Sequence, residues 1–155
     1  MGEKIIGMLF LISACWFATP LLPASPAVHD SSRQFYDRVM EEFRHGDYEA
    51  ALAGFRLFIE LHRHSSLAAS AQYWIGECQY RLGRYADALN SFDTVRSYPA
   101  NPKLAASAFK IGQTYSRLGE YKKAREMFDR VLEEYPHGAE AELARKALHV
   151  ISPQN

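Results

Sequence analysis

The sequence has little cysteine and no excess of charge of either sign. Its 155 residues contain only Cys15 and Cys78, so neither a disulfide framework nor a cysteine-rich metal site is available. Lysine plus arginine equals aspartate plus glutamate, at 18 each, and a chain without net charge lacks the positive field that attracts nucleic acid. Glycine-rich phosphate loops, the G-x-S-x-G elbow and the C-x-x-C-H haem motif are also absent. We therefore expect no nucleic-acid partner, no cofactor and no metal ion.

The remaining composition is that of a folded protein. Apolar residues make up 48% of the chain, aromatic residues 13% and charged residues 23%, which lies within the globular range. This length suits one compact domain or a short repeat array and leaves little room for a second domain. A multidomain enzyme is therefore not expected.

Residues 1–27 have the pattern of an export leader. A nearly continuous apolar run over residues 5–22 is followed by a Pro/Ala/Ser stretch over residues 23–27. Three outcomes stay open: signal peptidase cleavage after Ala27, lipidation of Cys15 in a lipobox-like stretch over residues 12–15, or an uncleaved anchor. All three predict a folded part outside the cytoplasm, either soluble in the periplasm or anchored to the outer membrane as a lipoprotein. Contact with the membrane is expected only through this leader or a lipid anchor.

An eight-residue motif with the pattern basic-x-Gly-x-Tyr-x-x-Ala occurs three times. Its glycines, Gly46, Gly83 and Gly119, are separated by 37 and 36 residues, which is the spacing of a helical-pair array. Each glycine follows an apolar helical stretch, where a left-handed C-terminal conformation favours glycine. A tyrosine, an alanine and a phenylalanine then recur at the helical period, and these mark the buried stripe of a second helix. The motif therefore predicts three helix–turn–helix units.

The periodicity predicts an all-α fold, an α-solenoid of three helical pairs plus a C-terminal capping helix over residues 32–151. The repeats are expected at about 32–64, 65–101 and 102–138, the cap at 139–151, with a linker at 28–31 and a tail at 152–155. The helices of the pairs are expected near 32–45, 48–62, 66–82, 85–97, 103–118 and 121–134. Gly76 and Gly112 lie in the middle of first helices and predict close helix crossings, because a mid-helix glycine otherwise costs about 1 kcal/mol. In the cap, Leu143 is among the residues expected to face inward.

These residues resemble the tetratricopeptide repeat, whose pattern is W-x-x-L-G-x-x-Y followed by Ala, Phe and Pro at set distances. Residues 111–136 fit the pattern fully, and residues 75–99 fit it with one residue missing before the proline. The resemblance implies a non-catalytic protein-binding adaptor or scaffold that holds partner segments in the concave groove lined by its first helices.

A narrower resemblance rests on three stretches: G-D-Y-E-A-A at residues 46–51, A-Q-Y-W-I-G-E at 71–77 and E-E-Y-P at 133–136. They are similar to the C-terminal repeat domain of the Tol-Pal system protein family YbgF/CpoB, and more distantly to the outer-membrane assembly lipoprotein family BamD. The first resemblance implies a bacterial envelope setting, with partners in the Tol-Pal system, cell division or peptidoglycan synthesis. The second implies an alternative, a structural subunit of an outer-membrane assembly complex. Self-association stays open.

The resemblance places ten residues in the expected groove. Aromatic platforms flanked by guanidinium groups suit an extended or helical peptide that carries carboxylates. An alternative is that the arginines only complement the dipoles at helix C-termini. The ten residues are Tyr36, Phe43, Arg44, Tyr73, Glu77, Tyr80, Arg81, Phe109, Gln113 and Arg117.

Few side chains suggest catalysis. Cys78 could act as a nucleophile, but its position in a first helix favours burial as a small apolar residue. His62 and His64 could offer two metal ligands, yet no third ligand follows at a suitable spacing. We therefore expect no enzymatic activity, with an enzyme that uses Cys78 as the remaining alternative.

Overall fold

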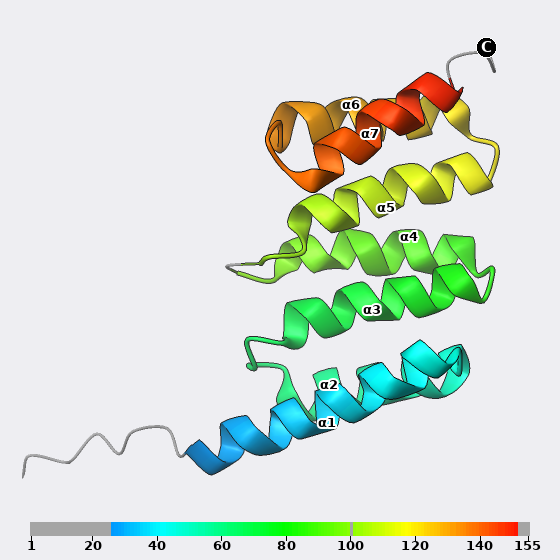
Figure 1. Cartoon of the computed structure of the whole chain (residues 1–155). Coiled ribbons are helices and arrows are strands. Elements are labelled where there is room, and N and C mark those ends of the chain that lie inside the picture. Colours follow the sequence, from blue (N-terminus) through cyan, green and yellow to red (C-terminus); the bar gives the residue numbers. More distant parts are fainter. Residues whose placement is uncertain (1–25, 100, 152–155) are drawn as a thin grey trace, which may run out of the picture.

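The computed structural model describes residues 26–99 and 101–151, and this part of the chain is all-helical, as expected. Figure 1 shows the helices stacked in chain order, with α1 at one end of the solenoid and α7 at the other. Cys15 and the tail at 152–155 lie outside the described residues. None of the helices in the described ranges is long and apolar enough to span a membrane. Their bounds are α1 Pro26–His45, α2 Tyr48–His62, α3 Ala68–Arg81, α4 Tyr85–Thr94, the 3₁₀ helix η1 Val95–Ser97, α5 Leu104–Arg117, α6 Tyr121–Glu134 and α7 Ala139–Ile151.

Three helix boundaries differ from the expectation by two residues or more. Helix α1 begins at Pro26, so residues 28–31 are helical and do not form a linker; proline is well suited to the first position of a helix, where its missing N–H is not needed. Helix α3 begins at Ala68, two residues later than expected, because Ser65 forms a turn before it. The Ser65 hydroxyl accepts a hydrogen bond from the Leu67 N–H group, and the Ser65 carbonyl oxygen accepts one from the Ala68 N–H group. Helix α4 ends at Thr94, and the rest of the stretch expected to be α-helical tightens into η1.

The three repeated glycines end the first helix of each pair, as expected. Their φ angles are +88° at Gly46, +74° at Gly83 and +78° at Gly119, a conformation that a side chain disfavours. After each glycine the next N–H group reaches back to a carbonyl five residues earlier, for example from Arg84 to Gln79 at 2.8 Å. This bond closes the helix end and turns the chain into the second helix.

The predicted helix crossings are confirmed at Gly76 and Gly112. A Cβ atom on Gly76 would lie 2.6 Å from the Phe92 ring, and one on Gly112 would lie 2.6 Å from the Phe128 ring. Both rings are fully buried, so each phenylalanine occupies the space that its glycine leaves open. The glycine–phenylalanine pair therefore sets the distance between the two helices of a repeat.

In the first repeat the close crossing is built differently, although Phe55 keeps the second-helix position of Phe92 and Phe128. Val39 occupies the first-helix position that Gly76 and Gly112 hold in the other repeats, and the glycine lies on the second helix instead, as Gly54. A Cβ atom on Gly54 would lie 2.7 Å from Cγ2 of Val39. The first pair thus reaches close packing through a different pair of residues.

The capping helix α7 packs on α5 and α6 and buries Ala141, Ala144 and Ile151. The expectation that Leu143 faces inward is wrong, because 46% of its side chain is exposed, and Val150 is exposed to 69%. In the described part of the chain no further helix follows α7 to cover these side chains. The cap therefore presents an apolar stripe to the surface.

Candidate partner-binding groove

The three aromatic residues expected as platforms are mainly core residues. Tyr36, Tyr73 and Phe109 are exposed to only 9%, 8% and 7%. The Tyr73 ring lies 5.6 Å from that of Phe92, and the Phe109 ring lies 5.5 Å from that of Phe128. The expectation of exposed platforms is therefore corrected: each ring packs against the phenylalanine of its own repeat, because the close crossing of the two helices brings that phenylalanine within reach.

Two hollows lie along the face formed by α3, α5 and α7. The first has a volume of about 290 Å³ and is lined by Tyr73, Phe109 and Lys110, with Glu140 and Leu143 from α7. The second has a volume of about 300 Å³ and is lined by Phe128 of α6 and by residues of the same three helices: Tyr80, Ser116, Arg117, Lys146, Ala147, Val150 and Ile151. Gln113 lines both hollows, so they adjoin at this residue. Together they form one groove with a mixed apolar and polar lining.

Five of the ten expected residues line this groove: Tyr73, Phe109, Gln113, Tyr80 and Arg117. The structure places the other five, Tyr36, Phe43, Arg44, Glu77 and Arg81, outside the two hollows. One groove wall, α7, was missed by sequence reasoning. The signal was available, since Leu143, Ala147 and Val150 recur at steps of four and three.

Glu77 joins two helices and is closed off from the surface. It is 4% exposed, and its Oε1 atom lies 2.7 Å from Nζ of Lys110 on α5. The contact is an ion pair without an aligned hydrogen bond. Lys110 also lies 5.3 Å from the ring of Tyr80. Burial raises the pKa of the neighbouring Tyr73 hydroxyl, and the Glu77 charge raises it further. Glu77 therefore holds α3 to α5 and positions Lys110 at the edge of the first hollow.

The three arginines have different local partners. Arg44 forms an ion pair with Glu41 on its own helix, and the Arg81 guanidinium lies 5.9 Å from the ring of Tyr48. Arg117 donates from Nε to the hydroxyl oxygen of Tyr80 at 3.0 Å, and this hydrogen bond raises the pKa of Arg117. Only Arg117 lines a hollow. The arginines thus do not form one row of anion-binding groups.

The side chains considered for catalysis have structural surroundings. Cys78 is fully buried, and burial raises the pKa of its thiol to about 12, with the Glu77 charge acting in the same direction. The His62 ring packs 5.2 Å from that of Phe58, and Nε2 of His64 accepts a bond from Nε of Arg63. Within residues 26–99 and 101–151 no three His, Cys, Asp or Glu side chains gather where they could hold a metal ion. A buried thiol with a raised pKa is a poor nucleophile.

Comparison with known families agrees with this geometry. Two tetratricopeptide repeat profiles match the chain, one over residues 36–102 and the other over residues 106–138. The chain belongs to the tetratricopeptide repeat family. Both profiles fall on the helical pairs, and the second ends at Gly138, immediately before α7.

Several solved structures share this tetratricopeptide repeat fold. The type III secretion chaperone SycD of Yersinia enterocolitica, in complex with a peptide of the translocator YopD, matches with a TM-score of 0.69 at 19% identity, covering 81% of this chain and 95% of that chain. PcrH in complex with the chaperone binding region of PopD matches with a TM-score of 0.68 at 21% identity, over 81% and 93%. YrrB, a protein with an unusual peptide-binding site, matches with a TM-score of 0.62 at 24% identity, over 74% and 57%. No curated protein sequence shows a significant match.

Proposed function

We propose that the protein is a non-catalytic adaptor that binds segments of partner proteins in the groove formed by α3, α5 and α7. The observation that carries this proposal is the continuity of the two hollows through Gln113. Their lining combines the exposed apolar side chains of Leu143 and Val150 with the cationic groups of Lys110 and Arg117. A peptide with apolar side chains and carboxylates is complementary to such a surface.

Two of the structural neighbours support the proposal by analogy. SycD is solved with a translocator peptide and PcrH with a chaperone binding region, so this fold carries peptide segments in other proteins. Segment binding needs no catalytic group, which agrees with the buried state of Cys78.

We place the adaptor in the bacterial cell envelope, in the periplasm or held at the outer membrane. The leader pattern over residues 1–27 supports export. The resemblance of residues 46–51, 71–77 and 133–136 to YbgF/CpoB supports a partner in the Tol-Pal system or in the coordination of division and peptidoglycan synthesis.

A photo-crosslinking amino acid at Gln113 tests the groove, because this residue lines both hollows. The matched control carries the same amino acid at Lys122, which is exposed on α6 and lines neither hollow. In envelope extract, the Gln113 chain should form a discrete crosslinked product that Arg117→Ala weakens and the Lys122 chain does not form. Equal products from both positions would show that the groove is not the binding site.

A second candidate is a permanent subunit of an outer-membrane assembly complex, similar to BamD. It is favoured by exposed leucines on the outer face of α2, Leu57 and Leu61, which would suit a lasting neighbour at this end of the solenoid. Purification without crosslinking separates the two candidates. A permanent subunit stays in a stoichiometric complex, whereas an adaptor dissociates on washing.

A further inference from the structure

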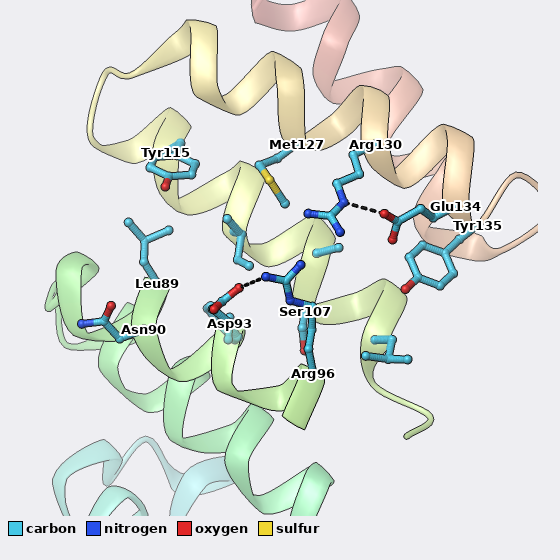
Figure 2. Close-up of a pocket in the computed structure, with 14 residues that line it drawn as sticks. Leu89, Asn90, Asp93, Arg96, Ser107, Tyr115, Met127, Arg130, Glu134 and Tyr135 are labelled. Carbon is cyan, nitrogen blue, oxygen red and sulfur yellow. Dashed lines mark hydrogen bonds and ion pairs between the residues drawn. The ribbon is translucent and has the colours of Figure 1, made fainter. Parts of the chain in front are cut away.

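A further cavity, separate from the two hollows of the groove, lies between the second helices of the last two repeats. Figure 2 shows this cleft, with walls from α4 and α6 and a floor from α5. It has a volume of about 270 Å³, and neither α3 nor α7 lines it, so it is separate from the groove. The proposed function makes no use of it.

The cleft has an apolar end and a charged end. Helices α4 and α6 are both second helices of their pairs, so they run in the same direction. Leu89 and Met127 therefore lie toward one end of the cleft, and Arg96 and Arg130 lie toward the other. Residues 89 and 96 are seven positions apart, so at the rise of an α-helix the cleft is about 10 Å long. A ligand that follows the cleft would therefore be apolar at one end and polar at the other.

The charged end holds two arginines, each paired with a carboxylate three or four residues away in the chain. Arg96 donates from Nη2 to Asp93 at 2.5 Å, and Arg130 donates from Nε to Glu134 at 2.5 Å. A guanidinium has five N–H groups, so each of these arginines keeps N–H groups that can donate to a further acceptor. Figure 2 shows both guanidinium groups directed into the cleft from opposite walls. The carboxylates are half-exposed and belong to local pairs of a weak kind, so an incoming anion can share the arginines with them.

A buried hydroxyl at the same end is also without a partner. Ser107 lines the cleft from α5 and is 1% exposed, and its Oγ atom has no hydrogen-bond partner in the described part of the chain. A buried polar atom of this kind is costly unless something that enters the cavity satisfies it. Arg96, Arg130 and Ser107 thus all line the same cleft, and each has a hydrogen-bond donor that a ligand could use.

We propose that the cleft binds a small amphipathic carboxylate. The apolar chain lies over Leu89, Ile111 and Met127, and the carboxylate accepts hydrogen bonds from Arg96 and Arg130, with the Ser107 hydroxyl as an additional donor. A cleft of about 10 Å accommodates an extended chain of about eight carbons, because each C–C bond of about 1.5 Å advances the chain by less than its length. The match of donors to a carboxylate and of apolar walls to an alkyl chain identifies the ligand class.

Methyl-labelled methionine gives a local readout in the whole chain. Met127 lines the cleft, whereas Met40 is buried in the core between α1 and α2 and serves as the internal control. Octanoate, kept below the concentration at which it forms micelles, should shift the Met127 methyl signal saturably and leave Met40 unchanged. Octanol and octylamine have the same chain without the carboxylate and should bind at least about tenfold more weakly, as expected for the loss of a charge-assisted hydrogen bond.

Two arginine variants complete the test. Arg96→Gln should weaken octanoate binding about tenfold. The matched control is Arg145→Gln on α7, because Arg145 has the same i,i+3 carboxylate pairing at 2.5 Å but does not line the cleft. The proposal is overturned if octanol binds as tightly as octanoate, if Met127 does not saturate, or if Arg145→Gln has the same effect as Arg96→Gln. The comparison of octanoate with octanol uses the unaltered chain and does not depend on how a variant folds.

Discussion

Replacing Gly76 with alanine should destabilise the fold in a way that depends on Phe92. The added Cβ atom would lie 2.6 Å from Cδ1 and Cε1 of Phe92 and 3.0 Å from Cζ. Carbon atoms in contact normally lie about 3.5–4.0 Å apart, so the overlap is about 1 Å. Because Phe92 is fully buried, its ring cannot move out of the way without displacing other core side chains.

The expected energy has two opposing parts. Overpacking of this kind costs about 1–3 kcal/mol, and replacing a helix-interior glycine with alanine gains about 1 kcal/mol. The net effect of Gly76→Ala is a loss of up to about 2 kcal/mol. Phe92→Ala alone should cost about 3–5 kcal/mol, because it removes a buried ring and leaves a cavity. With that ring absent, Gly76→Ala should change sign and stabilise the chain by about 1 kcal/mol.

Urea unfolding followed by circular dichroism measures all four chains of this double-mutant cycle. The coupling energy between Gly76→Ala and Phe92→Ala should be about 1–3 kcal/mol, within the range of residues in direct contact. Phe128→Ala is the matched control: it removes an equally buried ring that faces Gly112, so it should not relieve the cost of Gly76→Ala. If Gly76→Ala costs the same with and without Phe92, the proposed steric role of the glycine is refuted.

Three further predictions concern other parts of the chain. In a Cys15→Ser chain, Cys78 should react with a thiol reagent only on unfolding. Burial raises the pKa of the Cys78 thiol from 9.0 to about 12. The free energy of unfolding should therefore fall as the pH rises from about 9 towards 12, because in this range the thiol ionises in the unfolded chain but not in the folded one. Lys110→Met should cost about 3 kcal/mol in urea unfolding, because it leaves the Glu77 carboxylate buried and unpaired, and Glu77→Leu in the same chain should restore most of that loss. The intact mass of the exported protein should correspond either to a chain that begins at Val28 or to a lipidated chain that begins at Cys15; an unprocessed mass contradicts both.

The repeat architecture could be predicted because each signal is local and occurs three times. A glycine after an apolar helix needs only its own backbone conformation, and the paired small and large residues need only the neighbouring helix. The helical pairs, the turn glycines and the crossings at Gly76 and Gly112 are therefore all confirmed.

The composition of the groove could be predicted only in part. An aromatic residue at the helical period does not reveal whether it lies on the groove or within the core, since this depends on how closely the two helices of a pair approach. The sequence therefore predicts Tyr36 and Tyr73 on the groove surface, although both are buried. Lys110 and the α7 wall were missed because their positions depend on contacts between repeats: the ion pair of Lys110 with Glu77 joins two repeats, and α7 becomes a wall only when it is stacked on α5.

The contact of Val39 with Gly54, which the other repeats lack, restricts how the repeats can be recombined. A copy of α3 in place of α1 would set Gly76 toward Phe55, the counterpart of Phe92, and would remove the Val39 side chain that fills the space over Gly54. A copy of α4 in place of α2 would set Ser91, the counterpart of Gly54, against Val39. A Cβ atom at this position would lie only 2.7 Å from Cγ2 of Val39. Either chimaera should fold less well than one in which a complete helical pair is transferred. Duplication or grafting within this chain should therefore tolerate whole pairs as units and reject single helices.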